Sequence, residues 1–122
     1  MDTPAASQTS TMSTVVPNHF PSIPPTTTRL AIVGEAPGED EVVAGEPFVG
    51  VSGRFLRAIL GQVGGSVNQT FLGNICQVRP PNNEIDSFPW DGPEIQDGIA
   101  TLKQDLQVFH PNTLLLLGRS AF

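Results

Sequence analysis

The chain has 122 residues, which leaves room for at most one domain with a buried core. Twelve Asp and Glu residues outnumber six Lys and Arg residues, and this acidic balance argues against broad electrostatic capture of a phosphate backbone. One cysteine excludes an internal disulfide, and no apolar run approaches the ~20 residues that span a bilayer, so we expect a cytoplasmic protein with no membrane partner.

Residues 1–28 are rich in Thr, Ser and Pro and show no hydrophobic period. Such a segment buries too little apolar surface to offset the entropy lost on ordering. We therefore expect a disordered tail or linker over residues 1–28, without chemistry of its own, and one folded domain over residues 29–122.

The first expected strand spans residues 29–33, and its unbroken apolar run suits a strand covered on both faces. A long loop follows. Ser52 has the side chain of an N-cap for a helix that runs to about Gln62 and ends before Gly64 and Gly65. The predicted apolar face of this helix consists of Phe55, Leu56, Ile59, Leu60 and Val63.

A second strand is expected over residues 70–78, where the prolines that follow stop it. Pro93 suits the first position of a second helix, which Pro111 ends. One buried stripe is predicted on this helix from residues spaced by 4, 3, 4 and 3 positions: Ile95, Ile99, Leu102, Leu106 and Phe109. A third, buried strand is expected over residues 113–117, running into the first turn of a further helix.

The alternation of strands and helices predicts right-handed crossovers and a parallel sheet with helices on both faces. The fold class is therefore α/β, a three-layer αβα sandwich with a central parallel sheet. Because chains seldom stop at the start of a helix, we expect a domain truncated after its third strand.

The segment 34–53 follows the first strand, where open α/β sheets place their ligands. It contains five glycines, two prolines, several carboxylates and Phe48. It lacks the Lys-Ser/Thr of a P-loop and the GxGxxG spacing of a dinucleotide site, and its acids would repel phosphate. A nucleotide-phosphate site is therefore disfavoured.

Within this segment, GEAPG at 34–38, EPFVG at 46–50 and Gly53 resemble the first active-site motif of the uracil-DNA glycosylase superfamily. The resemblance is greatest to the thermophile-type, iron–sulfur branch and extends over about residues 29–122. It implies a protein that recognises flipped-out uracil in single- or double-stranded DNA and hydrolyses its N-glycosidic bond during base-excision repair.

The resemblance also implies the residues that bind uracil. Phe48 would stack on the base, and Asn74 would read its edge, since an amide presents a donor beside an acceptor. Glu35, Ala36 and Pro37 would border the base, with backbone amides near Glu35 and Ala36 holding its carbonyls. Without the motif, Phe48 would be read as a core residue and Asn74 as a turn or cap residue.

Two carboxylates are implied to be catalytic. Glu35 would belong to the base pocket, and Glu41 would lie close to the water and the sugar, where a carboxylate can orient water and favour a cationic sugar. We expect Glu39, Asp40 and Glu46 to be solvated loop charges.

The iron–sulfur branch holds its cluster with four cysteines, the usual ligation. Here the segment before the first strand contains no cysteine, Val78 stands at the third position, and Gly98 falls at or next to the fourth. We therefore expect no cluster, no metal and no other cofactor. Cys76 is expected to be a small buried apolar residue.

The late catalytic His-Pro-Ser/Ala segment of the superfamily is missing. His110 precedes a proline, but we expect it to be an ordinary residue at a helix C-terminus, at the end of the third strand opposite the site. His19 lies in the tail. Two alternatives to a glycosylase stay open: a non-catalytic DNA- or base-binding module of a replication protein, and an inactive fragment. A monomer is expected, with a fusion or replication-protein partner.

Overall fold

In the computed structural model of the chain, residues 14–25 and 27–118 are described. The first part of the expected tail, residues 1–13, and the helical turn expected after the third strand lie outside the described residues.

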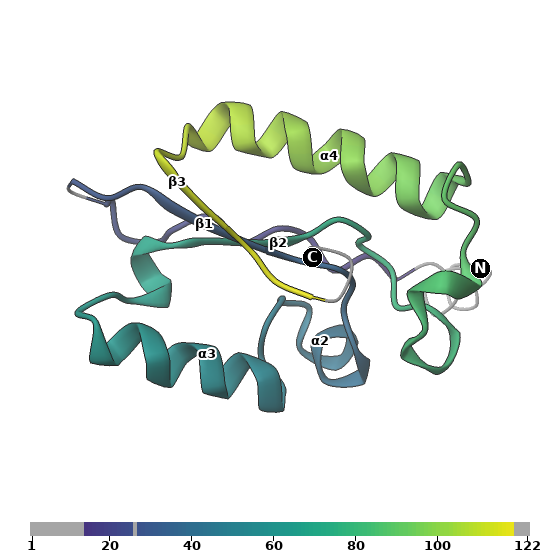
Figure 1. The fold of residues 1–122 in the computed structure, drawn as a ribbon, viewed down its shortest axis with the longest axis horizontal. Helices are drawn as coiled ribbons and strands as arrows, with labels where there is room; N and C mark the ends of the chain where they lie inside the picture. Colours follow the sequence, from purple (N-terminus) through teal and green to yellow (C-terminus); the bar gives the residue numbers. More distant parts are fainter. Residues whose placement is uncertain (1–13, 26, 119–122) are drawn as a thin grey trace, which may run out of the picture.

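The centre of the fold is a parallel sheet of three strands, β1 (Leu30–Gly34), β2 (Phe71–Asn74) and β3 (Thr113–Leu116). Its order is β2-β1-β3, so the first strand is the middle one. Helix α3 (Val51–Gln62) lies against one face and α4 (Pro93–Phe109) against the other (Figure 1). This arrangement confirms the expected αβα layers.

The helices differ from the expectation in one additional helix and in one boundary. A short helix, α2 (Glu39–Ala44), stands within the segment expected to be a loop. Helix α3 begins at Val51 with Gly50 as its N-cap, so the assignment of Ser52 as the N-cap is wrong. None of the helices in the described part of the chain is long and apolar enough to cross a membrane.

The core has one half on each face of the sheet. On the α4 face, Phe71 of β2 packs with the predicted stripe of α4, in which Ile95, Leu102 and Phe109 are buried. On the α3 face, the buried residues are Ile32, Leu56, Leu60 and Leu72. The face predicted for α3 is too broad, because only the Leu56 and Leu60 ridge meets the sheet. The other three members, Phe55, Ile59 and Val63, are exposed.

The second and third strands are shorter than expected. Beyond Asn74 the chain passes the end of β1, where the N–H groups of Ile75 and Cys76 donate to the carbonyls of Gly34 and Glu35. Three 3-10 turns flank β2: η1 (Val67–Gln69) precedes it, and η2 (Pro81–Asn83) and η3 (Ile85–Ser87) follow it. The leucines of β3 are exposed, not buried as predicted, because among the described residues this strand pairs only with β1.

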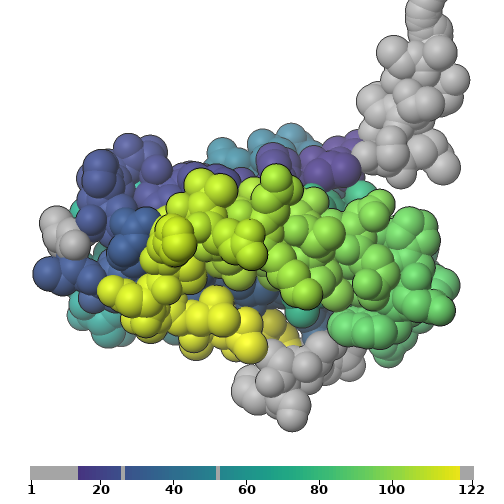
Figure 2. Space-filling view, turned by 90° about the horizontal axis from the view of Figure 1, so that it is seen from above, coloured from purple at the N-terminus to yellow at the C-terminus, as the bar shows by residue number. Residues whose placement is uncertain are grey.

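The N-terminal segment, residues 14–23, packs against the outer edge of β2. His19 exchanges two backbone hydrogen bonds with Leu72, and the N–H of Val16 donates to the carbonyl of Gln77. Val16 is only 2% exposed. Figure 2 shows this purple segment on one flank of α4 and the yellow β3 on the other. The expectation of an unpacked tail is therefore wrong for residues 14–23.

Candidate functional site

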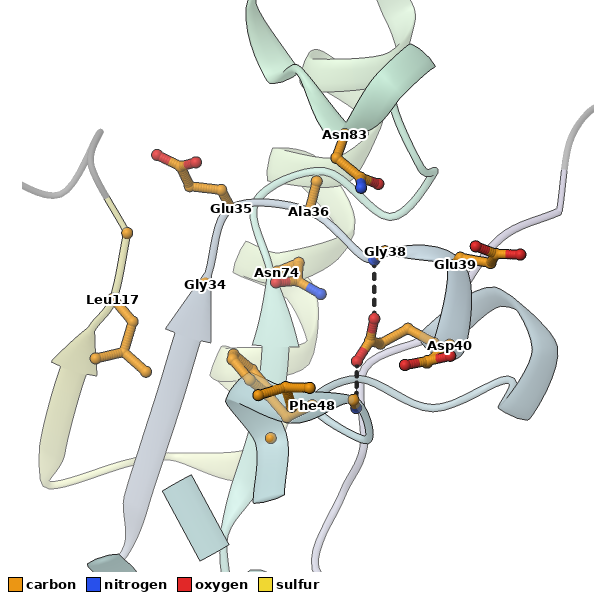
Figure 3. A pocket seen from close by; sticks show the side chains of 15 residues that line it. Gly34, Glu35, Ala36, Gly38, Glu39, Asp40, Phe48, Asn74, Asn83 and Leu117 are labelled. Carbon is orange, nitrogen blue, oxygen red and sulfur yellow. Dashed lines mark hydrogen bonds between the residues drawn. The ribbon is translucent and has the colours of Figure 1, made fainter. Parts of the chain in front are cut away.

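A cavity of about 580 Å³, here called the main cavity, opens at the carboxyl end of β1. The end of each strand contributes to it, with Gly34 from β1, Asn74 from β2 and Leu117 just after β3 (Figure 3). Parallel strands carry their ligand sites at this edge because the connecting loops converge there. The remaining lining residues come mostly from the loops around α2, from the first turn of α2 and from the start of α3: Glu35, Ala36, Gly38, Glu39, Asp40, Glu41, Phe48, Gly50, Val51 and Gly53, with Asn83 and Gly118.

The structure brings the side chains of Phe48 and Asn74 together over Gly34. A Cβ atom built on Gly34 would lie 2.8 Å from Cζ of Phe48 and 2.8 Å from Oδ1 of Asn74. Asn74 is 5% exposed, so its amide is held at the floor of the cavity. An aromatic ring beside an amide can stack on a planar base and pair with its edge.

The backbone of Phe48 adopts the left-handed conformation, with φ of 58°. A bulky residue rarely takes this conformation, so its surroundings must hold it. Its carbonyl accepts a hydrogen bond from Nη2 of Arg57 at 3.1 Å. A Cβ on Gly53 would lie 1.9 Å from the same carbonyl oxygen, so only glycine allows this approach of α3.

Glu41 lies in the first turn of α2 and accepts three backbone hydrogen bonds. Its Oε1 takes the N–H of Gly38 at 2.9 Å, and its Oε2 takes those of Val49 at 3.0 Å and Gly50 at 2.8 Å. Partial burial alone would raise the pKa of Glu41, but the donors from Gly50, Val49 and Gly38 outweigh it. The pKa of this carboxyl therefore lies below its ordinary value of 4.5.

The other three sequence-predicted residues differ in their relation to the main cavity. Glu35 lines it, but its side chain is directed toward the end of β3 and away from Asn74 (Figure 3). Ala36 lines both the main cavity and a neighbouring hollow of about 100 Å³. Pro37 is buried and lines only this smaller hollow.

Several lining residues were not found by sequence reasoning. Glu39 and Asp40 are exposed, as predicted for solvated charges, but they also line the main cavity, whereas Glu46 does not. Asn83 reaches the cavity from the turn after β2, where its Oδ1 accepts a hydrogen bond from Nε of Arg79 at 2.8 Å. The sequence offered only a turn signal there.

The main cavity is acidic. It is lined by four carboxylates, those of Glu35, Glu39, Asp40 and Glu41. Among the residues that the structure describes, no Lys, Arg or His lines it. Such a cavity disfavours a phosphate group inside it. It favours a neutral ligand or one on which positive charge develops.

Neither histidine reaches the cavity. His110 is the C-cap of α4 and precedes β3, so it lies at the opposite edge of the sheet, as expected. His19 pairs with β2 through its backbone.

Two positions to which the resemblance assigns cluster cysteines lie close together. Val78 and Gly98 line one shallow groove of about 190 Å³. A Cβ on Gly98 would lie 2.2 Å from the carbonyl oxygen of Ile75, so no thiolate fits there without a backbone shift. Cys76 is fully buried, as predicted, and its thiol donates to the carbonyl of Val78. Burial raises the pKa of this thiol.

The chain is similar to known proteins over most of its length. The family model described as "Uracil DNA glycosylase superfamily" matches residues 20–122. A type-4 uracil-DNA glycosylase of Archaeoglobus fulgidus is 36% identical over 104 residues, covering 85% of this chain and 50% of that protein. The type-4 enzymes of Saccharolobus solfataricus and Thermotoga maritima are each 34% identical over 95 residues. Those matches cover 75% and 77% of this chain and 41% and 47% of the relatives, so the chain spans half of their length or less.

Proposed function

Because the chain belongs to the uracil-DNA glycosylase superfamily, we propose that its main cavity receives a uracil flipped out of DNA and that the protein hydrolyses the N-glycosidic bond. The observation that carries this proposal is the meeting of the Phe48 ring and the Asn74 amide over Gly34. The substrate is uracil-containing DNA, single- or double-stranded.

Binding would depend on stacking and on edge recognition. Stacking of a base on an aromatic ring contributes about 1–3 kcal/mol. The buried amide of Asn74 offers a donor and an acceptor to the edge of the base, and a base that cannot pair with both would leave a buried polar group unsatisfied. Backbone amides near Glu35 and Ala36 would hold the carbonyls of uracil.

In the reaction, the bond between C1′ of the sugar and N1 of uracil breaks and its electron pair leaves with the base. Uracil departs as an anion that takes up a proton, and a water oxygen bonds to C1′ and loses a proton. The acidic lining stabilises the positive charge that develops on the sugar. Glu35, on the β3 side of the cavity, is the carboxylate that we propose to act near the sugar and the water.

A second candidate function is recognition of uracil without turnover. No Lys, Arg or His lines the described cavity, so this part of the protein offers no cationic donor to the leaving anion. For either function we propose that no iron–sulfur cluster is bound, because one cysteine cannot supply four thiolates.

The test measures uracil release and DNA affinity with one oligonucleotide that contains a single deoxyuridine and a matched one that contains thymidine. Phe48→Ala should weaken deoxyuridine-specific affinity by roughly five- to one-hundred-fold, the loss of one stacking contact. Asn74→Asp should weaken the affinity for deoxyuridine DNA, because the amide donor becomes a second acceptor and the side chain no longer matches the carbonyl beside N3–H on the edge of uracil.

Matched controls are Phe55→Ala, on the exposed face of α3, and Asn68→Asp, on an exposed turn. Both should leave affinity and release unchanged. Release that depends on Phe48 and Asn74 supports hydrolysis, whereas specific binding without release supports the second candidate. If the protein does not distinguish deoxyuridine from thymidine, both functions are excluded.

A further inference from the structure

We infer that Glu41 is a positioning residue whose carboxylate clamps the turn after Phe48 to the start of α2 and so fixes the ring in the main cavity. This inference rests on the proposed function for its consequence in DNA binding. It differs from the role near the water and sugar that the resemblance implies for Glu41.

The first argument is that the acceptor positions of Glu41 are largely occupied. Oε2 takes two N–H donors from Val49 and Gly50, and Oε1 takes one from Gly38. A carboxylate has about four lone-pair sites, so three backbone bonds leave about one. The carboxylate therefore lies between the start of α2 and the turn after Phe48 and is hydrogen-bonded to both. A group held in this way is poorly placed to take a proton from water.

The second argument is that the hydrogen bonds of Glu41 hold the backbone next to Phe48, the residue in the unfavourable left-handed conformation. Phe48 has a positive φ, and Val49 and Gly50, which Glu41 binds, follow it directly. On the other side of the Phe48 peptide, Arg57 binds the carbonyl. The peptide is therefore held from two directions, and the ring lies above Gly34 as a result.

The third argument is that the local sequence makes room for the carboxylate. A Cβ on Gly50 would lie 3.2 Å from Oε2 of Glu41 and 3.0 Å from Oδ2 of Asp40. Glycine at position 50 therefore lets the backbone approach the acid closely. Glutamine at position 41 would turn an N–H₂ group toward Gly38 or toward the pair of Val49 and Gly50, so it cannot replace the clamp.

The variant that tests this inference is Glu41→Gln, with Glu46→Gln as the matched control. Glu46 lies in the same loop, is exposed and does not line the main cavity. The probe is a single-stranded oligonucleotide with one deoxyuridine beside the fluorescent base 2-aminopurine. We expect Glu41→Gln to weaken its binding about tenfold, equivalent to about 1.4 kcal/mol, and Glu46→Gln to leave it unchanged.

A double-mutant cycle separates positioning from chemistry. If Glu41 acts through the ring, Phe48→Ala combined with Glu41→Gln should bind no more weakly than Phe48→Ala alone. Losses that multiply in the double variant would overturn the inference. So would a Glu41→Gln protein that binds deoxyuridine DNA as the unmodified protein does but no longer releases uracil.

A measurement on the unmodified protein guards against a variant that fails to fold. In a pH titration followed by NMR, the amide signals of Gly38, Val49 and Gly50 should move together as Glu41 is protonated, with a midpoint below 4.5. Independent movement of these signals would overturn the clamp. This measurement needs no DNA, so a failure of the clamp and a failure of the proposed function give different results.

Discussion

The ring of Phe48 and the amide of Asn74 approach the same point, the position that a Cβ atom would occupy on Gly34. Phe48 comes from the loop before α3, and Asn74 comes from the end of β2. Helix α3 and the turn η1 lie between them in the sequence. Their meeting depends on the parallel pairing of Gly34 with Asn74, the last pair in the β1–β2 register. The floor of the main cavity is therefore set by the sheet itself.

Gly34→Ala should close this floor. The added methyl group would overlap both side chains, and such overpacking costs about 1–3 kcal/mol of folding free energy. We expect affinity for deoxyuridine DNA to fall by at least about tenfold, because the ring or the amide must move. Urea unfolding and the binding assay would measure both effects. Gly61→Ala is the control: it lies in α3, nothing is within 4 Å of its Cβ position, and it should stabilise the protein by about 0.5–1 kcal/mol.

Asn18→Ala should destabilise the protein from outside the cavity. Nδ2 of Asn18 donates to Asp105 of α4 at 2.8 Å, and Oδ1 accepts the N–H of Asn74 at 3.4 Å. A part-buried hydrogen bond to a charged group contributes about 1.5–3 kcal/mol, so a loss of this size is expected in urea unfolding. Gln104→Ala on the exposed face of α4 should change stability little. Equal stability of Asn18→Ala and the unmodified protein would show that the N-terminal segment is not anchored by this contact.

Cys76 should be inert in the folded protein. Its side chain is fully buried and its pKa is raised by burial, so little thiolate is present and reagents cannot reach it. We expect Ellman's reagent to react only after denaturation.

Protein purified under anaerobic conditions should contain no stoichiometric iron and show no visible absorption band. Iron in stoichiometric amount would contradict the proposal that no cluster is bound.

Stability should depend on pH through Glu41. Its pKa is lower in the folded protein than in the unfolded chain, so its stabilising contribution is fully present above about pH 4.5 and is lost as the pH falls through the lower, folded pKa. The difference in unfolding free energy between the unmodified protein and Glu41→Gln should therefore be constant near neutral pH and shrink in acid. A gap that widens in acid would contradict the sign of this shift.

The elements that the sequence predicts well are those with a buried, periodic face. Helix α4 was found with its stripe because residues spaced by three and four positions can bury only on a helix. Helix α2 was missed because it has six residues, none of them buried, and ends at Gly45 with φ of 73°. It is stabilised in place by Glu41, a contact that no hydrophobic period reports.

Burial by neighbouring segments was harder to predict. The leucines of β3 are apolar, but their exposure depends on what pairs beside the strand, which local sequence does not encode. The pairing of residues 14–23 with β2 was also missed. Backbone N–H and C=O groups form these hydrogen bonds, and a segment of any composition carries such groups. Among the residues of the site, Phe48 and Asn74 could be predicted from the sequence motif. Asn83 could not, because its position depends on how the turn after β2 folds back over the cavity.

At position 48, the positive φ of the backbone favours glycine, whereas stacking on a ligand requires an aromatic side chain. Holding a bulky side chain in this conformation costs about 1–3 kcal/mol, and glycine at the same position would relieve that cost. Selection for thermal endurance alone would therefore remove the aromatic group from position 48. An aromatic residue kept at this position in proteins with the same cavity would indicate that contact with a ligand outweighs the backbone preference for glycine.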